Sequence, residues 1–243
     1  MRTIAGAIGI IVMLWIPGTL TGCGGDREQD AGAGEAADEV LEAADRTLAT
    51  GSARIEATID ARGDIYRLVQ RADFDSERAA GRLIPPPGEV EADGPLRQYI
   101  DGPRGFIQVS GKWYEQEKGA IAQLRDSPSS FLALLDETLV DVRESSMPAP
   151  AGLRRFDAGY EVAGIAEAAG EEVPEGLVGF DTPVSIYLDE DGLIPRVELT
   201  ISDGEDDPST SISSTFELSR FGEDPRVGEP PTPVATVPSE SGL

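Results

Sequence analysis

The stretch VSIYLDEDGLIPRVELTI, residues 184–201, holds the clearest structural signal in the sequence. Apolar side chains occupy every second position over residues 184–188 and again over residues 197–201. A period of two places successive side chains on opposite faces of a β-strand. The acidic segment Glu190-Asp191-Gly192 between the two runs has the composition of a hairpin turn. The stretch therefore predicts an antiparallel hairpin with one apolar face and one solvated face.

The same period of two recurs on both sides of this hairpin. Gly63-Asp64 and Ser110-Gly111 supply further turn signals between alternating runs. Together these patterns predict an antiparallel sheet whose strands each have one wet face. The predicted strands cover residues 54–61, 66–74, 106–109, 112–115, 156–162, 184–188, 197–201 and 212–218.

Two amphipathic helices accompany the strands. Apolar residues recur at spacings of three and four over residues 37–48, and Gly51 gives the helix its stop. Ser127-Pro128 has the composition of a second helix start, and apolar residues follow over 131–139. A short third helix is a candidate at 165–170. Roughly eight to eleven strands and two or three helices predict an α+β fold, a curved antiparallel β half-barrel covered on its concave side by the helices.

Residues 1–22 have the three parts of a secretory signal: a basic start at Arg2, an uncharged run over 4–16, and small residues before a cleavage point. The uncharged run is shorter than the roughly 20 apolar residues that span a bilayer. Leu20-Thr21-Gly22-Cys23 resembles the bacterial lipobox. That resemblance implies a diacylglyceryl group on Cys23, cleavage before it, and a lipid anchor on the outer face of the cell membrane. An ordinary signal peptide with a cysteine near the cut is the alternative.

The rest of the chain divides by composition. Residues 23–35 are polar and glycine-rich, which predicts a flexible tether. Residues 36–221 hold all the periodic segments and form the predicted domain. Residues 222–243 are rich in proline, which predicts an extended, poorly ordered tail. Since Cys23 is the single cysteine, no internal disulfide is available and a packed core must supply the stability.

Charge and composition exclude several functions. The formal net charge is −25, which argues against nucleic acid and against charge-driven docking on an anionic bilayer. The absence of histidine removes the commonest general base, and no nucleophile elbow, phosphate-binding loop or dinucleotide fingerprint occurs. The acidic stretches 189–192 and 203–207 lack the spacing of a calcium loop, and a turn is the favoured interpretation of the first. We therefore predict no enzymatic activity, no cofactor and no metal.

The order of these motifs resembles that of actinobacterial envelope lipoproteins of the LppX/LprG group. The resemblance rests on the lipobox, the alanine-rich helix, TGSARIEATID at 50–60, Gly-Lys-Trp-Tyr at 111–114 and the 184–201 hairpin. Proteins of this group share the fold of the Lol-type lipoprotein carriers, an open half-barrel lined with apolar side chains and lidded by helices. The resemblance implies that the chain binds a lipid or acylated ligand in the half-barrel and carries it between envelope layers.

A one-sided sheet must bury its apolar face, and a curved sheet under few helices can leave a gap that a lipid fills. Two interpretations stay open: a lipid-binding carrier, or a non-enzymatic interaction or sensing module with a filled core that contacts other envelope proteins through an acidic outer face. The candidates for the inner, ligand-facing side of the sheet are Ile55, Ile59, Leu68, Phe74, Phe106 and Trp113.

Overall fold

The computed structural model describes most of the predicted domain and part of the tail. It covers residues 31–61, 63–86, 95–102, 104–116, 132, 135–161, 181–201 and 212–237. The predicted signal, Cys23, the start of the second helix at Ser127-Pro128, the candidate helix at 165–170 and the acidic stretch 203–207 lie outside these residues.

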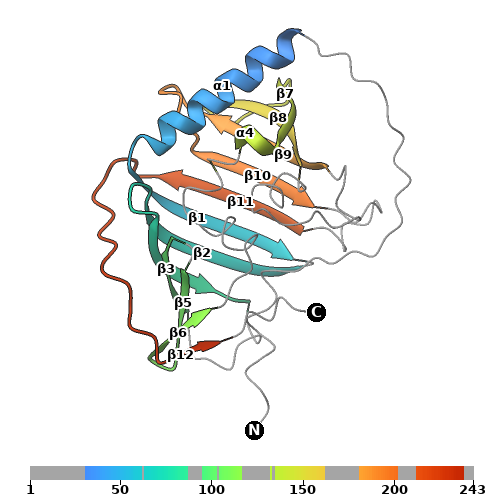
Figure 1. Cartoon of the computed structure of the whole chain (residues 1–243). Coiled ribbons are helices and arrows are strands. Elements are labelled where there is room, and N and C mark those ends of the chain that lie inside the picture. The colour runs from blue at the N-terminus through green and yellow to red at the C-terminus, as the bar shows by residue number, and fades with distance from the viewer. Residues whose placement is uncertain are drawn as a thin grey trace.

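A twelve-stranded sheet forms the body of the protein (Figure 1). The strand order is β12-β6-β5-β4-β3-β2-β1-β11-β10-β9-β8-β7, and every neighbouring pair is antiparallel except β12 with β6. Because β12 and β7 do not pair with each other, the sheet stays open. The strands are β1 Ser52–Ala61, β2 Asp64–Asp73, β3 Arg78–Ile84, β4 Leu96–Asp101, β5 Arg104–Val109, β6 Lys112–Gln116, β7 Leu139–Glu144, β8 Arg154–Glu161, β9 Asp181–Leu188, β10 Arg196–Ile201, β11 Ile212–Ser219 and β12 Ala235–Val237.

The strand register gathers apolar side chains on one face. Ala57 of β1 lies opposite Leu68 of β2, which in turn lies opposite Leu83 of β3. On the other side of β1, Ala57 lies opposite Phe216 of β11, which lies opposite Val197 of β10. We call this side of the sheet the inner face and the reverse side the outer face. The alternation predicted from the sequence is confirmed along β1, β2, β10 and β11, whereas β3 was not predicted as a strand.

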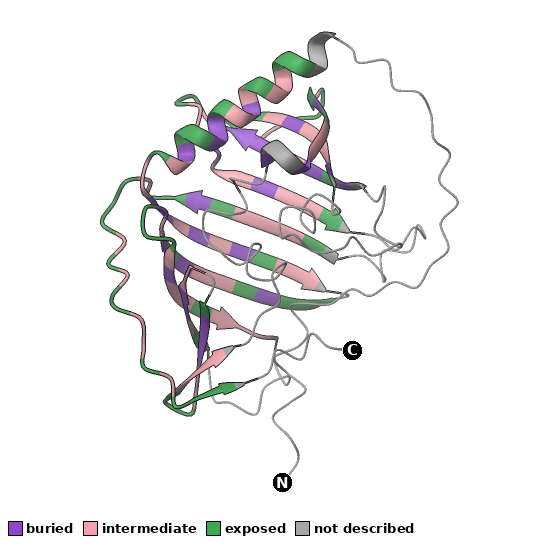
Figure 2. Cartoon of the chain, viewed as in Figure 1, coloured by how far each residue is buried: buried purple, intermediate pink, exposed green. Residues whose placement is uncertain are grey.

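The helix α1, Ala31–Leu48, lies across one end of the inner face (Figure 1). Its buried stripe is Val40, Ala43 and Ala44, which packs into the same core cluster as the sheet residues (Figure 2). This spacing of three and four is the one expected for a helix with one apolar side. The large side chains with at most 2% exposure in this cluster include Phe156, Leu135, Ile186, Leu188, Ile194 and Val197.

A buried threonine fixes α1 on the sheet. The Thr47 hydroxyl donates to the carbonyl of Ala43 over 2.7 Å and accepts the backbone N–H of Ile194 over 2.9 Å. Ile194 lies between β9 and β10, so this bond joins the last turn of the helix to the hairpin. The guanidinium of Arg46 also donates to the carbonyl of Gly192 over 3.3 Å. The helix is therefore held by polar contacts as well as by apolar packing.

The helical cover differs from the prediction. Within the described ranges the helical elements are α1 and the four-residue α4, Leu135–Thr138, so the two or three covering helices are not shown. The helix α1 begins at Ala31, inside the segment predicted as a tether over 23–35, because the alanines there favour a helix despite their glycine neighbours. No helix in the described part of the chain is long and apolar enough to cross a bilayer.

The predicted turns are confirmed. Ser110 and Gly111 have φ angles of 49° and 77°, the two left-handed residues that a tight hairpin between β5 and β6 requires. In the 184–201 hairpin, the Asp189 carboxylate accepts the backbone N–H groups of Asp191 over 3.0 Å and of Leu193 over 2.8 Å. The first acidic stretch therefore closes a turn, which is the interpretation that the sequence favoured.

Residues 222–237 of the tail, which the sequence predicts to be extended and poorly ordered, form hydrogen bonds with the sheet. The N–H of Gly222 donates to the carbonyl of Ser52 over 3.0 Å, and the N–H of Val234 donates to the carbonyl of Trp113 over 2.8 Å. β12 then pairs with β6. The segment runs along one side of the molecule between these points (Figure 1). Its prolines leave it extended, and hydrogen bonds to the sheet hold it in place. Residues 238–243 lie outside the described part.

A tyrosine on the outer face ties down the middle of this segment. The Tyr99 hydroxyl donates to the carbonyl of Gly228 over 2.5 Å, and the ring meets Phe106 edge-on at 6.1 Å between centroids. Burial raises the pKa of Tyr99, so the hydroxyl keeps its proton and remains a donor. Both aromatic side chains are buried although they lie on the outer face.

Because Ile186 lies in the core, we expect its truncation to have a large effect on the stability of the fold. We expect Ile186→Ala to lower the free energy of unfolding by about 2–5 kcal/mol, because the side chain is fully buried and its removal leaves a cavity. The exposed Ile65 is the control, for which alanine should change stability by about 0.5 kcal/mol or less. Urea unfolding followed by circular dichroism measures both. Equal losses in the two variants would contradict the assigned core.

The C-terminal contact gives a second prediction. Tyr99→Phe should destabilise the fold by about 1 kcal/mol and accelerate amide hydrogen exchange in residues 222–237, because the bond to Gly228 is lost. Tyr187→Phe is a matched control, since its hydroxyl donates to Glu198 on another part of the sheet. Unchanged exchange in the tail of the Tyr99 variant would count against the observed docking.

Candidate ligand-binding face

The structure places four of the six predicted site residues on the inner face. Ile55 and Ile59 lie on β1, and Leu68 lies on β2 next to them. Phe74 follows the end of β2 and belongs to the core cluster at the α1 end. Ile55 is 8% exposed and Phe74 is 7% exposed, whereas Ile59 and Leu68 are only partly buried. Whether these side chains contact a ligand stays a prediction.

Phe106 and Trp113 lie on the outer face instead. Phe106 lies opposite Tyr99 and Glu115, and Trp113 lies opposite Gln108. Apolar residues occupy both faces of this hairpin: Tyr99 and the Arg104 guanidinium lie against the Phe106 ring, and the C-terminal segment bonds to Tyr99 and Trp113 on the same face. The period of two gave no way to choose between the two faces, because the segment bonded to this face lies more than a hundred positions later in the chain. The placement of these two residues on the inner face is therefore corrected.

Burial along the inner face is uneven. At the α1 end Ala53, Ala72 and Leu218 are buried in the core cluster. Farther from α1 the burial is mixed, because Ala57, Tyr66 and Leu96 of the inner face are also buried. The partly buried apolar side chains between them are Ile59, Leu68, Leu83, Leu199 and Phe216, of which the last two pack against the core cluster. The inner face beyond the α1 end thus keeps a partly exposed apolar set.

The inner face also carries a polar pair on β2 and β4. The side-chain amide of Gln98 donates to the carbonyl oxygen of Gln70 over 3.2 Å, and Gln70 is only 7% exposed. Gly81 on β3 lies between them in the register. A Cβ at Gly81 would come within 2.4 Å of the Val69 carbonyl oxygen, so glycine is what permits this close approach. The pair supplies amide groups in an otherwise apolar surrounding.

Thr182 supplies a second polar group on this face. It lies opposite Tyr160 on β8, is 1% exposed, and its hydroxyl has no hydrogen-bond partner within the described part of the protein. A buried hydroxyl without a partner is costly and rare. A ligand with an oxygen or amide near Thr182 would satisfy it. The inner face therefore suits a molecule that is mainly apolar and carries a few polar groups.

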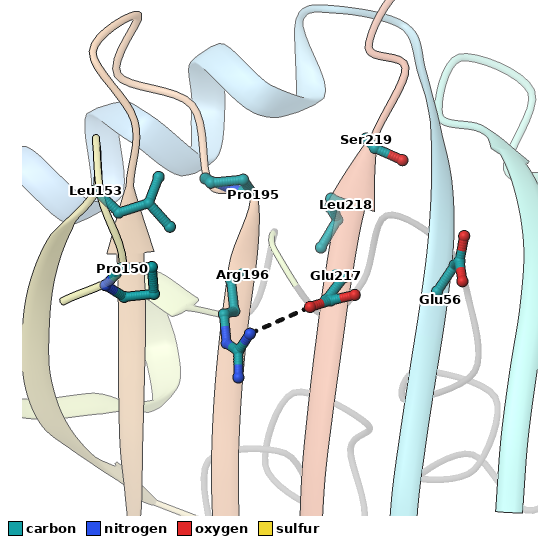
Figure 3. A pocket seen from close by; sticks show the side chains of 8 residues that line it. All are labelled: Glu56, Pro150, Leu153, Pro195, Arg196, Glu217, Leu218 and Ser219. Atoms are coloured by element: carbon teal, nitrogen blue, oxygen red, sulfur yellow. Dashed lines mark hydrogen bonds and ion pairs between the residues drawn. The ribbon is translucent and has the colours of Figure 1, made fainter.

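A shallow pocket lies on the other side of the sheet (Figure 3). Arg196 forms ion pairs with Glu217 over 3.1 Å and with Glu198 over 2.5 Å, while Glu56 pairs with Arg54 over 2.7 Å. Each of these charges is neutralised by a neighbour, so none is poised as a reactive group. The residues that line the pocket are Glu56, Pro150, Leu153, Pro195, Arg196, Glu217, Leu218 and Ser219.

The described outer face of the sheet carries arginines and carboxylates side by side, and the acidic surface of the interaction-module interpretation stays a prediction. Tyr187 lies between the guanidinium groups of Arg155 and Arg196, 5.9 Å and 5.7 Å from its ring centroid. Burial and the hydrogen bond to Glu198 raise the pKa of Tyr187. Among the described residues no three histidine, cysteine or acidic side chains cluster as metal ligands do. The charged groups of this face pair within a strand, as Arg54 does with Glu56, and across strands, as Arg196 does with Glu217.

An open, one-sided antiparallel sheet crossed by a helix on its inner face is a β half-barrel. No protein-family model and no curated protein sequence matches the chain. Among solved structures, the chain is similar to LprF from Mycobacterium bovis, with a TM-score of 0.52 and 11% identity over 84% of this chain and 100% of that chain. This similarity shows the fold, and it confirms that the fold is of the type that the resemblance to the LppX/LprG group implied.

Two other solved structures align with the chain over a similar share of its length but with lower TM-scores. An uncharacterised conserved protein from Thermus thermophilus has a TM-score of 0.44 at 11% identity over 83% of this chain and 98% of that chain. A LolA superfamily protein, NE2245 from Nitrosomonas europaea, has a TM-score of 0.33 at 8% identity over 83% of this chain and 96% of that chain. Neither score is high enough to carry a structural argument.

Because the buried Thr182 hydroxyl has no hydrogen-bond partner among the described residues, we expect its removal to stabilise the protein. Thr182→Val keeps the shape of the side chain and removes the buried hydroxyl, so the ligand-free protein should gain about 1–3 kcal/mol of stability. Thr58→Val, at an exposed position on the outer face, should change stability by about 0.5 kcal/mol or less. Thermal unfolding of delipidated protein measures the difference. A loss of stability at Thr182 would show that its hydroxyl has a partner in the ligand-free state.

Proposed function

We propose that the protein is an exported lipoprotein that binds a lipid or acylated ligand against its inner face and carries it within the cell envelope, without catalysing a reaction. The observation that carries this proposal is the partly buried apolar set beyond the α1 end of the sheet. Each buried methylene of an acyl chain contributes about 0.8 kcal/mol, so a long chain lying there would be held firmly. The half-barrel fold shared with LprF supports the same function.

The polar groups of the inner face refine the class of ligand. Gln70 and Gln98 offer amide donors and acceptors, and Thr182 offers a hydroxyl. A hydrocarbon would leave the Thr182 hydroxyl without a partner and could not use the remaining amide groups of the glutamine pair, whereas a glycolipid or acylated peptide has oxygens and amides to pair with them. We therefore propose an amphiphilic ligand whose chains contact the apolar set and whose polar part reaches one of these groups.

The proposed site in the cell follows from the N-terminal motifs. Acylation of Cys23 would anchor the chain on the outer face of the cell membrane. The residues after Cys23 lead directly to α1, so the anchor would hold the half-barrel by the helix that crosses its inner face. A carrier held in this way could receive its ligand from the membrane and pass it to other envelope proteins or layers.

A matched pair of substitutions on β2 tests the ligand-binding face. Leu68→Asp places a charge on the inner face, and Val69→Asp places the same charge one residue along on the outer face. The chain without residues 1–23 is purified gently and weighed by native mass spectrometry, and the bound lipid is then extracted and identified. We expect stoichiometric lipid with the unsubstituted chain and Val69→Asp, and little or none with Leu68→Asp.

Two results would overturn the proposal. A ligand-free mass that does not change when acylated lipids are added would leave the filled-core interaction module as the better account. Equal loss of lipid from both aspartate variants would mean that the lipid is not held on the inner face. Circular dichroism of all three proteins separates loss of binding from loss of folding.

A further inference from the structure

Four arginines converge on one groove of the outer face. The groove lies where the chain leaves β11 and begins the C-terminal segment, beside β1 and β2. Two acidic residues share it, so the lining has a surplus of two positive charges in a protein whose net charge is −25. The residues that line it are Ala53, Arg54, Arg71, Arg220, Glu223, Asp224, Pro225 and Arg226.

Two of these arginines face each other across strands. Arg54 of β1 lies directly opposite Arg71 of β2. Like charges at such a position are destabilising. Arg54 is neutralised by Glu56 over 2.7 Å, but Arg71 has no ion-pair partner in the described part of the chain. Among the described residues, one exposed guanidinium is therefore left without an ion-pair partner beside another.

The other two arginines have strained backbones. Arg220 and Arg226 have φ angles of 54° and 48°, in the left-handed region that side chains other than glycine and asparagine rarely adopt. Such strain persists only where the surroundings enforce it, and it clusters at binding sites. Here the Ser52 hydroxyl donates to the carbonyl of Glu223 over 2.7 Å, and the N–H of Gly222 donates to the carbonyl of Ser52 over 3.0 Å. These bonds fix the segment between the two arginines.

The acidic residues of the groove leave the guanidinium groups available. The Glu223 carboxylate is 3.9 Å from Arg220, and the Asp224 carboxylate is 3.8 Å from Arg226. Both distances exceed a hydrogen bond, so neither acid takes a guanidinium donor of these two arginines, and Asp224 instead accepts the backbone N–H of Arg226 over 3.0 Å. Within the described part of the chain, the guanidinium donors are therefore available to a ligand.

We propose that this groove binds a phosphate group. Guanidinium groups match the oxygens of a phosphate with paired N–H donors, and several of them around one anion is the usual arrangement of a phosphate site. A bound phosphate neutralises Arg71 and uses the donors of the two strained arginines. The site lies on the outer face and is separate from the apolar inner face. The proposal of a phosphate site therefore does not depend on the proposal that the protein carries a lipid.

A matched pair of substitutions on β2 tests the site. Arg71→Gln removes an arginine of the groove, while Arg67→Gln removes an exposed arginine from the same face of the same strand outside it. Titration of the full-length protein in a neutral detergent with inorganic phosphate, at low ionic strength, gives the affinity. We expect Arg71→Gln to weaken phosphate binding at least tenfold and Arg67→Gln to change it less than twofold.

A second arm identifies the source of the phosphate. Dihexanoyl-phosphatidylglycerol is titrated in place of inorganic phosphate, with dihexanoyl-phosphatidylcholine as the zwitterionic control. A tenfold effect of Arg71→Gln with phosphatidylglycerol alone supports the site and indicates a lipid headgroup, and the same effect with inorganic phosphate alone indicates a soluble phosphate. Equal effects of the two substitutions, or no measurable binding of either ligand, would overturn the proposal.

Discussion

The contact between α1 and the inner face is the constraint on which the rest of the structure depends. An open sheet with one apolar face cannot remain in water uncovered. Val40, Ala43 and Ala44 bury their small side chains against the sheet, and Thr47 holds the helix to Ile194. Among the described residues α1 covers one end of the inner face, and a partly buried apolar set lies beyond it. The proposed binding face is a consequence of this partial cover.

The two faces of the sheet have different chemistry. On the inner face a few polar groups, such as Gln70 and Thr182, stand among apolar side chains, which suits an amphiphile. Ion pairs such as Arg196 with Glu217 join neighbouring strands on the outer face. The C-terminal segment also binds this face, where its Gly228 accepts a hydrogen bond from the buried Tyr99. Where that segment starts, arginines accumulate beyond their counter-charges. If both proposals hold, the protein binds acyl chains on the inner face of the sheet and a phosphate group on the outer face.

The sequence predicted what depends on neighbouring residues. The 184–201 hairpin and the turn at Gly111 follow from a period of two and from turn chemistry within a few residues. The face on which Phe106 lies could not be predicted in this way, because the segment bonded to that face is distant in the chain. The contacts of the tail with the sheet could not be predicted for the same reason, because its hydrogen bonds go to the distant residues Ser52 and Trp113. The glutamine pair around Gly81 also needs the register of three strands, which no local pattern gives.

Photolabelling with an acyl lipid that carries a diazirine near the end of its chain tests the central claim most directly. After irradiation, the labelled residues are identified by tandem mass spectrometry. The account predicts labels on inner-face residues beyond the α1 end, such as Leu68 and Leu199, and none on their outer-face neighbours Val69 and Glu198. Labels confined to the outer face, or spread equally over both faces, would contradict an acyl-binding inner face.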